Sequence, residues 1–404
     1  MQVFIARQPI LDLKQNLYGY ELLFRDSYQN FFTSNNPDQA SASTVASAAF
    51  TFDWDALTDG RMVFVNATRS ILLGDSIGVL PPDHTVIEVL ETVEPDEQVL
   101  AACRRWKNAG FRMALDDFVY ARQYEPLMEL ADVIKVDILA TDDQYQRKLA
   151  QICGDRGITA LAEKVENIEE FKKTQQMGYS LFQGYFFARP EILTHRDIPT
   201  SKLDQLELLR QLQNPELDLD KMERLLRRNV GLSYKLLRYI NSAFFALPIE
   251  VRSVRHALTL LGELEVRKWA SLVILAGLVE NKPEAILLQA IFRAKFLEGL
   301  APLCSMENRS QDLFLMGLFS LLDAILDQPM QDVLESMPLS PDIKDALLTQ
   351  QGKPGALLNL CYAYEQGKWE QFSSLAHLLG LDEIYVPAVY EQALTWARSG
   401  FMDD

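Results

Sequence analysis

The first 190 residues alternate short apolar runs with longer amphipathic segments, and this alternation restricts the possible folds more than any other feature of the chain. Segments with the spacing of helices, such as 97–109 and 142–156, lie between the apolar runs. Strands that alternate with helices predict parallel βα units. The runs of strand length are eight in number, at residues 2–6, 18–24, 61–66, 84–91, 111–117, 133–139, 158–165 and 179–187. So many runs in fewer than 200 residues favour a closed, TIM-like (β/α)8 barrel over an open sheet.

Two adjacent carboxylates, Asp116 and Asp117, end the fifth of these runs. Neighbouring residues of a regular strand face opposite sides, so both side chains reach one site only if the strand ends there. An aspartate directly after a strand is also a common N-cap of the following helix. The pair by itself leaves both interpretations open.

Further polar residues lie in or at the end of the other apolar runs. They are Glu21, Asn66, Glu88, Lys135, Glu163 and Gln183. In a barrel the carboxyl ends of the strands converge on one face, and a buried charge is costly unless it is paired or metal-bound. Carboxylates with one asparagine suit Mg²⁺ or Mn²⁺, and adjacent carboxylates can serve two metal ions that activate water against a phosphodiester. Any one of these residues has a cap or a loop salt bridge as its alternative, but the whole set at successive strand ends favours a metal site.

Composition excludes several classes of function. The formal net charge of −17 argues against general nucleic-acid binding, which needs a basic face, and against adsorption to anionic membranes. The N-terminal run carries Arg7 and Asp12, unlike a signal peptide, and no apolar run reaches membrane-spanning length. Four scattered cysteines suit a reducing compartment, so we expect a cytoplasmic protein. The four histidines lie far apart and suggest no histidine-based metal cluster.

The second half of the chain has a different pattern. Residues 191–202, with Pro199 and Thr200, have the composition of a linker. Beyond it the pattern is helical, with segments at 203–212, 218–228, 233–240, 254–264, 286–300, 312–326 and 372–379. Several of these helices are so apolar that they must pack together. We therefore expect an all-α domain over residues 203–404.

Residues 1–190 resemble an EAL domain, the family of cyclic di-GMP phosphodiesterases. No single motif carries the resemblance; their order and spacing do. The naming motif is Glu21-Leu22-Leu23-Phe24-Arg25, with Leu22 where the family usually has alanine. The others are Gln8-Pro9-Ile10, Asn66, Glu88-Val89-Leu90-Glu91, Asp116-Asp117-Phe118, Lys135-Val136-Asp137, Ala162-Glu163-Lys164-Val165-Glu166 and Gln183-Gly184.

The resemblance implies a role for each matched residue. One metal ion, Mg²⁺ or Mn²⁺, would bind Glu21, Asn66, Glu88 and Asp116, and a second would bind Asp116, Asp117 and Glu163. Lys135 would position the attacking water, held by an ion pair with Asp137, and Gln183 would bind water or substrate. Gln8 and Arg25 would contact the substrate, Arg25 by clamping a phosphate oxygen. Glu91 and Glu166 would support the ligands. The family reaction converts cyclic di-GMP to linear pGpG.

One segment departs from the family pattern. Active members carry a glycine-rich Gly-Thr/Ser-Gly-Tyr-Ser loop after the aspartate pair, whereas this chain has Val119-Tyr120-Ala121-Arg122-Gln123-Tyr124. Glycine lets a backbone adopt φ > 0 and move as a lid, which Val119 and Ala121 do not do at low cost. We therefore expect metal and ligand binding to survive better than turnover.

The helical half resembles an HDOD domain, an all-α relative of the HD hydrolases that has lost their metal-binding His-Asp pair. The resemblance rests on Leu236 to Phe245, followed by Leu247-Pro248, Ser253-Val254 and Ala257 to Gly262. Ser320 and Leu321 stand where an HD enzyme has His and Asp, which leaves Asp323 as a cap or surface charge. We interpret His256 as a helix-face or packing residue, and Asn241 as a buried residue that satisfies backbone groups at a helix end.

Two functions follow from the two resemblances, and a third is set against them. The first is a two-metal cyclic di-GMP phosphodiesterase with a regulatory HDOD domain that binds an unknown protein partner. The second is a catalytically impaired EAL domain that senses cyclic di-GMP or acts as an adaptor. The third, a scaffold, leaves the metal-type residues at the strand ends without a reason. EAL domains often dimerise, so the resemblance also implies a homodimer.

Overall fold

The computed structural model describes residues 3–26, 54–189, 251–279, 282–335, 337 and 339–401, together with 212, 222–223, 236–237 and 240–241. The chain divides into two compact units. The first comprises Met1–Arg189 and Ala363–Trp369, and the second comprises Pro190–Tyr362 and Glu370–Asp404. The expected linker at 191–202 lies outside the described residues, as do most of the expected helices at 203–212, 218–228 and 233–240 and most of the Leu236 to Phe245 motif.

The first unit contains a closed barrel in which eight strands pair in chain order and β8 returns to β1. This confirms the barrel expected from the sequence, and each strand lies on one of the eight apolar runs. The strands are β1 Val3–Asp12, β2 Leu17–Asp26, β3 Met62–Ala67, β4 Thr85–Val89, β5 Arg112–Leu115, β6 Val133–Asp137, β7 Thr159–Glu163 and β8 Leu181–Gln183.

The expectation of purely parallel pairing is wrong for β1. This strand is antiparallel to both of its neighbours, β2 and β8, whereas the pairings from β2 to β8 are parallel. The physical reason is the short connection between β1 and β2. A tight turn, in which Asp12 Oδ1 accepts from the N–H groups of Lys14 and Asn16, can join only antiparallel strands, because a parallel crossover needs a dozen or more residues.

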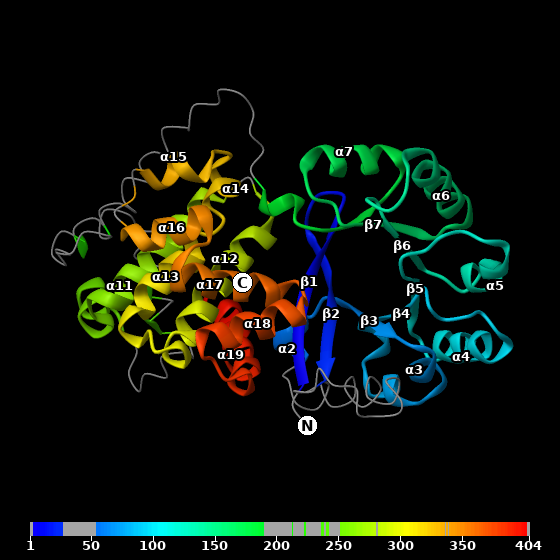
Figure 1. The fold of residues 1–404 in the computed structure, drawn as a ribbon, viewed down its shortest axis with the longest axis horizontal. Coiled ribbons are helices and arrows are strands. Elements are labelled where there is room, and N and C mark those ends of the chain that lie inside the picture. The colour runs from blue at the N-terminus through cyan, green and yellow to red at the C-terminus, as the bar shows by residue number, and fades with distance from the viewer. Residues whose placement is uncertain are drawn as a thin grey trace. The chain divides into compact units, whose positions relative to one another are not determined.

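Helices lie outside the strands, as Figure 1 shows for α4, α6 and α7. The two longest helices in the described part of this unit, α4 and α6, begin at aspartate caps: Asp96 accepts from Val99 N–H, and Asp142 from Tyr145 N–H. The α-helices are α2 Trp54–Thr58, α3 Arg69–Leu73, α4 Glu97–Asn108, α5 Glu125–Met128, α6 Asp143–Arg156 and α7 Ile168–Met177. Short 3-10 helices are η1 Ser76–Val79, η2 Pro82–His84, η3 Arg122–Tyr124 and η4 Phe186–Ala188.

An apolar layer fills the inside of the barrel. Its buried members come from seven of the strands: Ile10, Phe64, Val86, Ala114, Val133, Leu161 and Leu181. Successive side chains of a strand alternate between the inside and the outside of a barrel. The inward residue that follows each of these along the chain therefore stands two positions further on, at the carboxyl end of the parallel strands.

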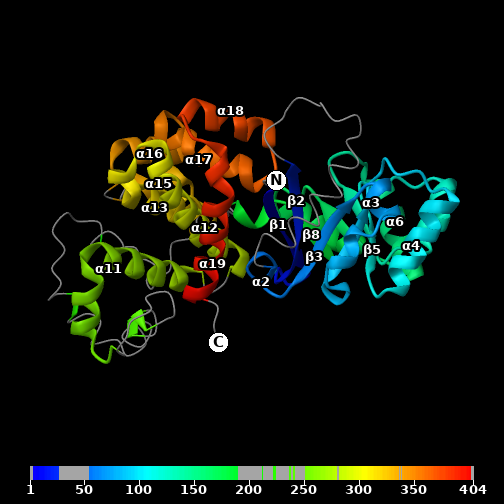
Figure 2. The ribbon, with the colours of Figure 1, turned by 90° about the horizontal axis from the view of Figure 1, so that it is seen from below.

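The described part of the second unit is helical. Its helices are α11 Val254–Leu278, α12 Glu284–Leu300, α13 Ser310–Phe319, α14 Leu322–Leu326, α15 Met330–Glu335, α16 Pro341–Thr349, α17 Gly352–Glu365, α18 Trp369–Leu379 and α19 Val386–Phe401. Short 3-10 helices are η5 Pro302–Cys304, η6 Glu307–Arg309 and η7 Glu383–Tyr385. Gly262, with φ 71° and ψ 170°, interrupts α11, and Figure 2 shows its two halves running in different directions. No helix among the described residues is long and apolar enough to cross a membrane.

The described residues test three expectations for the helical half. Asn241 is exposed rather than buried, but it does satisfy backbone groups: Nδ2 donates to the carbonyls of Leu237 and Val251, and Oδ1 accepts from Val251 N–H. The expected helix over 312–326 is in fact two helices, α13 and α14, separated at Ser320 and Leu321. His256 lies on the exposed face of α11.

Candidate active site

A polar layer lies directly above the apolar layer of the barrel. Each polar residue stands two positions after an apolar inward residue of its own strand, so the alternation of the strand turns it to the inside. Asn66 follows Phe64, Glu88 follows Val86, Asp116 follows Ala114, Lys135 follows Val133, Glu163 follows Leu161 and Gln183 follows Leu181. Gln8 stands two positions before Ile10, on the strand that runs in the opposite direction, and pairs with Glu21 in the register of β1 and β2.

Lys135 lies at the centre of this layer, 1% exposed, and its ammonium contacts four carboxylates. The distances from Nζ are 3.1 Å to Glu21 Oε2, 2.8 Å to Glu88 Oε1, 3.0 Å to Asp116 Oδ1 and 2.8 Å to Glu163 Oε1. The structure thus brings together side chains from β2, β4, β6 and β7 with the residue that follows β5. Four buried or nearly buried carboxylates share one cation.

Two amide side chains complete the layer through Glu21. Asn66 Nδ2 donates to Glu21 Oε1 at 3.0 Å, and Gln183 Nε2 donates to Glu21 Oε2 at 2.6 Å. Gln183 Nε2 also donates to Gln8 Oε1 at 3.0 Å. Both amide nitrogens face carboxylate or amide oxygens, and the side-chain oxygens of Asn66 and Gln183 have no hydrogen-bond partner among the described residues.

Burial and crowding of like charges shift the pKa values of the cluster in different directions. Burial raises the pKa of Glu163 to about 8, although Lys135 opposes the shift. Burial, reinforced by the charge of Glu21, raises the pKa of Glu88 well above its usual value. Burial also raises the pKa of Asp116. Burial acts on Glu21 too, but the ion pair with Lys135 and the bonds from Gln183 and Asn66 outweigh it and lower its pKa.

The charge of Lys135 is fixed by the same cluster. Burial by itself lowers the pKa of this ammonium, but the surrounding carboxylates, led by Glu21 and Glu88, raise it well above its usual value. Lys135 therefore stays a cation at neutral pH. Its positive charge only partly compensates the carboxylates around it, and the site retains a demand for further positive charge or for protons.

Several buried oxygens of the site have no hydrogen-bond partner among the described residues, so a cation or a proton would be stabilised beside them. These atoms are Asn66 Oδ1, Glu88 Oε2, Asp117 Oδ1 and Gln183 Oε1. Glu88 Oε1 contacts Lys135 but also has no aligned hydrogen bond. Oxygen donors of this kind fit a hard divalent cation. In the present arrangement around Lys135, no three His, Cys, Asp or Glu side chains among the described residues are placed to hold a metal ion. Metal binding therefore requires the carboxylates of the site to shift.

Asp117 stands outside the inner cluster and contacts a different lysine. Lys164 Nζ lies 4.0 Å from Asp117 Oδ2 and forms a closer ion pair with Asp137 Oδ2. The expected ion pair between Asp137 and Lys135 is therefore wrong. Asp137 ends β6, where its carboxylate accepts from the N–H groups of Leu139 and Ala140 and turns away from the barrel interior toward Lys164.

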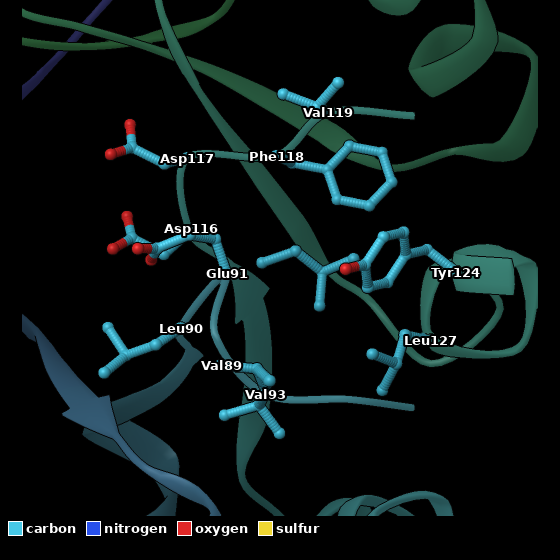
Figure 3. Close-up of a pocket in the computed structure, with 11 residues that line it drawn as sticks. Val89, Leu90, Glu91, Val93, Asp116, Asp117, Phe118, Val119, Tyr124 and Leu127 are labelled. Atoms are coloured by element: carbon cyan, nitrogen blue, oxygen red, sulfur yellow. The ribbon is translucent and has the colours of Figure 1, made fainter. Parts of the chain in front are cut away.

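A cavity of about 150 Å³ opens beside the aspartate pair. Figure 3 shows the carboxylates of Asp116, Asp117 and Glu91 on one side of it, and the apolar side chains of Phe118 and Leu127 on the other. Glu91 is exposed. The cavity therefore joins an acidic edge to an apolar wall whose residues Phe118 and Leu127 flank the segment that departs from the family pattern.

That segment is held by α6 rather than by glycines. The hydroxyl of Tyr145 accepts from Tyr120 N–H at 2.6 Å and donates to the carbonyl of Phe118 at 3.4 Å. Phe118 N–H donates to the carbonyl of Lys135 at 3.1 Å. Glu125 accepts from the hydroxyl of Tyr120 and, at 2.7 Å, from Arg156. The backbone that follows Asp117 is thus fixed by side chains.

Two other expected site residues lie apart from the inner cluster. The guanidinium of Arg25 lies over the ring of Phe4, 5.3 Å from its centroid. Glu166 pairs with Arg189 at 3.0 Å, and its N–H donates to Glu170. Lys164 and Tyr145, which also contact the site, were not predicted from the sequence. A basic residue directly after a strand-end glutamate was a usable signal for Lys164, but no local pattern marks Tyr145.

Comparisons with known proteins agree with the two-unit division. A profile of the EAL domain matches residues 40–190, and a profile of the HDOD domain matches residues 198–337. The chain is 32% identical over 407 residues to YuxH, an uncharacterized protein of Bacillus subtilis, with 99% of each chain covered. It is 32% identical over 401 residues to the cyclic di-GMP phosphodiesterase CdgJ of Vibrio cholerae, with 98% of this chain and 92% of CdgJ covered.

Among solved structures, BlrP1 of Klebsiella pneumoniae in complex with calcium and cyclic di-GMP is similar to part of the chain. The identity is 26% and the TM-score 0.40, with 47% of this chain and 56% of BlrP1 covered.

Proposed function

This chain belongs to the family of two-domain EAL–HDOD proteins that includes YuxH and CdgJ, and from that premise we propose that its barrel is a metal-dependent phosphodiesterase that hydrolyses cyclic di-GMP to pGpG. One observation carries the proposal. Carboxylates from separate strand ends meet around Lys135 and leave buried oxygens without partners. Buried ion pairs add little net stability to a fold because desolvation offsets their attraction, so this cluster is better explained by a role in binding a ligand.

The donor set suits one or two Mg²⁺ or Mn²⁺ ions. Glu21, Asn66, Glu88 and Asp116 would hold the first, and Asp116, Asp117 and Glu163 the second. A bound divalent cation would supply charge neutralisation at the phosphate and make water a better nucleophile.

The remaining roles fall to side chains around the proposed ligands. Lys135 stays protonated within the carboxylate cluster, so it would orient a water or phosphate oxygen by donating hydrogen bonds. Gln183, whose Oε1 has no partner among the described residues, would accept a hydrogen bond from the same water or from the substrate. Gln8, which contacts Gln183, would bind the substrate. Asp137 would keep Lys164 beside Asp117.

A second candidate function rests on the segment from Val119 to Tyr124. The Tyr145 hydroxyl of α6 hydrogen-bonds to this segment and to Phe118 before it, and a backbone held in this way is less suited to act as a catalytic lid. The alternative is therefore a barrel that binds cyclic di-GMP without turning it over and passes this state to a partner. In either case we propose that the HDOD domain binds a protein partner.

One experiment separates the two candidates. The full chain is incubated with cyclic di-GMP and Mn²⁺ or Mg²⁺, and pGpG is measured by chromatography while binding is measured by calorimetry. Product that depends on the metal and disappears in Glu21→Ala supports the phosphodiesterase. Binding without product supports the sensor. A chain that neither binds nor hydrolyses the nucleotide contradicts both.

A further inference from the structure

Two residues that face each other across the rim of the barrel share an unusual backbone conformation. Asp117 has φ +40° and Lys164 has φ +58°, and neither is a glycine. The left-handed region is uncommon for residues with a Cβ, and lysine is not among those enriched there. Conformations of this kind persist only where the surroundings hold them, and they cluster at functional sites. The pair follows β5 and β7 respectively, on the site face of the barrel.

The strained backbone of Lys164 places its ammonium between two carboxylates. Its Nζ forms an ion pair with Asp137 and lies 4.0 Å from Asp117 Oδ2. The other oxygen of Asp117, Oδ1, is buried and has no partner among the described residues. Lys135 does not contact Asp117: it contacts Asp116 instead. The adjacent aspartates are thus assigned to two separate cations, Asp116 to Lys135 and Asp117 to Lys164.

This arrangement gives the inner cluster and Asp117 different affinities for a divalent cation. A divalent ion at the inner cluster would add charge to four carboxylates that share only Lys135. A divalent ion at Asp117 would meet the ammonium of Lys164, which already compensates that carboxylate and would repel the incoming charge. The inner half of the site consists of the four carboxylates around Lys135, and the outer half consists of Asp117 beside Lys164. The two halves therefore differ in the positive charge that the protein supplies to each carboxylate.

We propose that Lys164 is a positioning residue that acts as the resident cation of the outer half of the site, so that the chain binds one divalent ion tightly at the inner cluster and a second one weakly at Asp117. This inference rests on the proposed metal dependence and specifies its stoichiometry. Lys164 thereby sets the concentration at which the second divalent ion binds at Asp117.

The test is a titration of the full chain, stripped of metal with EDTA and dialysed, with Mn²⁺ followed by the electron paramagnetic resonance signal of the free ion. The wild type is compared with Lys164→Gln, Lys164→Gly and Lys164→Arg. Lys173→Gln is the matched control, because Lys173 is similarly exposed and pairs with Asp143 on the surface helices α6 and α7. No nucleotide is needed, so the readout is independent of turnover.

We expect one tight and one weak site in the wild type, in Lys164→Arg and in Lys173→Gln. In Lys164→Gln and Lys164→Gly the second site should tighten by about fivefold, because the repulsion of a unit charge about 4 Å away is removed and solvent screens this partly exposed pair. Equal affinities in the wild type and Lys164→Gln would overturn the inference and leave the phosphodiesterase proposal intact. So would tightening in Lys164→Gly alone, because backbone strain and not charge would then be responsible. A wild type that binds no Mn²⁺ would overturn the inference and the proposed metal dependence together.

Discussion

Lys135 Nζ lies 2.8 Å from Glu88 Oε1, and the two side chains are 1% and 0% exposed. An ammonium has three protons to donate, whereas four carboxylates surround this one. At least one carboxylate must therefore lack a proton of Lys135 to itself, and both oxygens of Glu88 are buried without a hydrogen-bond partner among the described residues. The carboxylates with raised pKa values, led by Glu88 and Glu163, accept protons in the absence of a metal and give the site its pH sensitivity.

Replacing Lys135 with methionine should destabilise the barrel and abolish hydrolysis. The substitution leaves the carboxylates with no cation, and a buried charge that loses its partner costs about 3–5 kcal/mol. The loss should be smaller at pH 5, where Glu88 and Glu163 are protonated. Denaturant unfolding of metal-free protein at pH 5 and pH 8 measures the difference. Lys173→Met, which breaks a surface ion pair, is the control and should cost less than about 1 kcal/mol. Equal stability of Lys135→Met and wild type at pH 8 would contradict the assigned role.

The metal-free protein should lose stability as the pH rises from 5 to 8. The pKa of Glu163 is raised from 4.5 to about 8 by burial, so its contribution to folding is fully present below pH 4.5 and is lost as the pH rises through about 8. Glu88 acts in the same direction. One titrating group changes the unfolding free energy by up to about 1.4 kcal/mol per pH unit.

Glu163→Gln, which cannot ionise, should flatten this pH dependence, and saturating Mn²⁺ should reverse it, because a cation favours the ionised carboxylates. The free energy of unfolding in urea at intervals of half a pH unit gives the slope. Glu169→Gln, an exposed substitution on α7, should keep the slope of the wild type. A stability that is constant or rises over this range in metal-free wild type would refute the assigned protonation of Glu163.

The barrel and its inner cluster were predictable because both depend on a period of two. Apolar residues such as Val86 and Leu161 mark the inward face, and the polar residues two positions later, Glu88 and Glu163, must share that face. The same rule places Lys135 on the inward face, but its contacts with four carboxylates were not predicted. The direction of β1 depends instead on the length of its turn, which the pattern of apolar runs does not encode.

Other features depend on contacts that no periodicity reports. Asp137 shares the strand face of Lys135, but the strand ends there and the side chain turns toward Lys164. The positive φ of Lys164 is set by its tertiary surroundings. Tyr145 lies 25 residues from the backbone N–H that it accepts, and only the packing of α6 brings them together. The expected pairing of Asp137 failed for this reason, and the roles of Lys164 and Tyr145 were missed.

Tyr145→Phe should loosen the segment after Asp117 without unfolding the barrel. The substitution removes the oxygen that accepts from Tyr120 N–H and donates to the carbonyl of Phe118, a loss of about 1 kcal/mol. Hydrogen exchange followed by mass spectrometry should show faster exchange in peptides that contain Tyr120. Tyr18→Phe, which removes a hydroxyl that accepts from Arg112 near the starts of β2 and β5, should leave those peptides unchanged. Unchanged exchange in Tyr145→Phe would mean that the segment is held by other contacts.

Gly184→Ala should destabilise the first unit and displace Gln183. Gly184 has φ +143°, and a Cβ at this position would lie 2.1 Å from the carbonyl oxygen and 2.5 Å from the nitrogen of Val165. The backbone of Val165 forms hydrogen bonds with residues before and after Gly184. Val165 N–H donates to the carbonyl of Gln183, and Phe186 N–H donates to the carbonyl of Val165. We expect a loss of about 3 kcal/mol in unfolding free energy.

Gly154→Ala is the matched comparison for Gly184→Ala. Gly154 lies inside α6, and a Cβ there would meet no atom within 4 Å. Alanine favours a helix over glycine, so this variant should gain about 0.5–1 kcal/mol. Urea unfolding of both variants, together with Mn²⁺ affinity as a measure of the site, gives the contrast. If Gly184→Ala were as stable as Gly154→Ala and bound Mn²⁺ like the wild type, the close approach of β8 to Val165 would not be what positions Gln183.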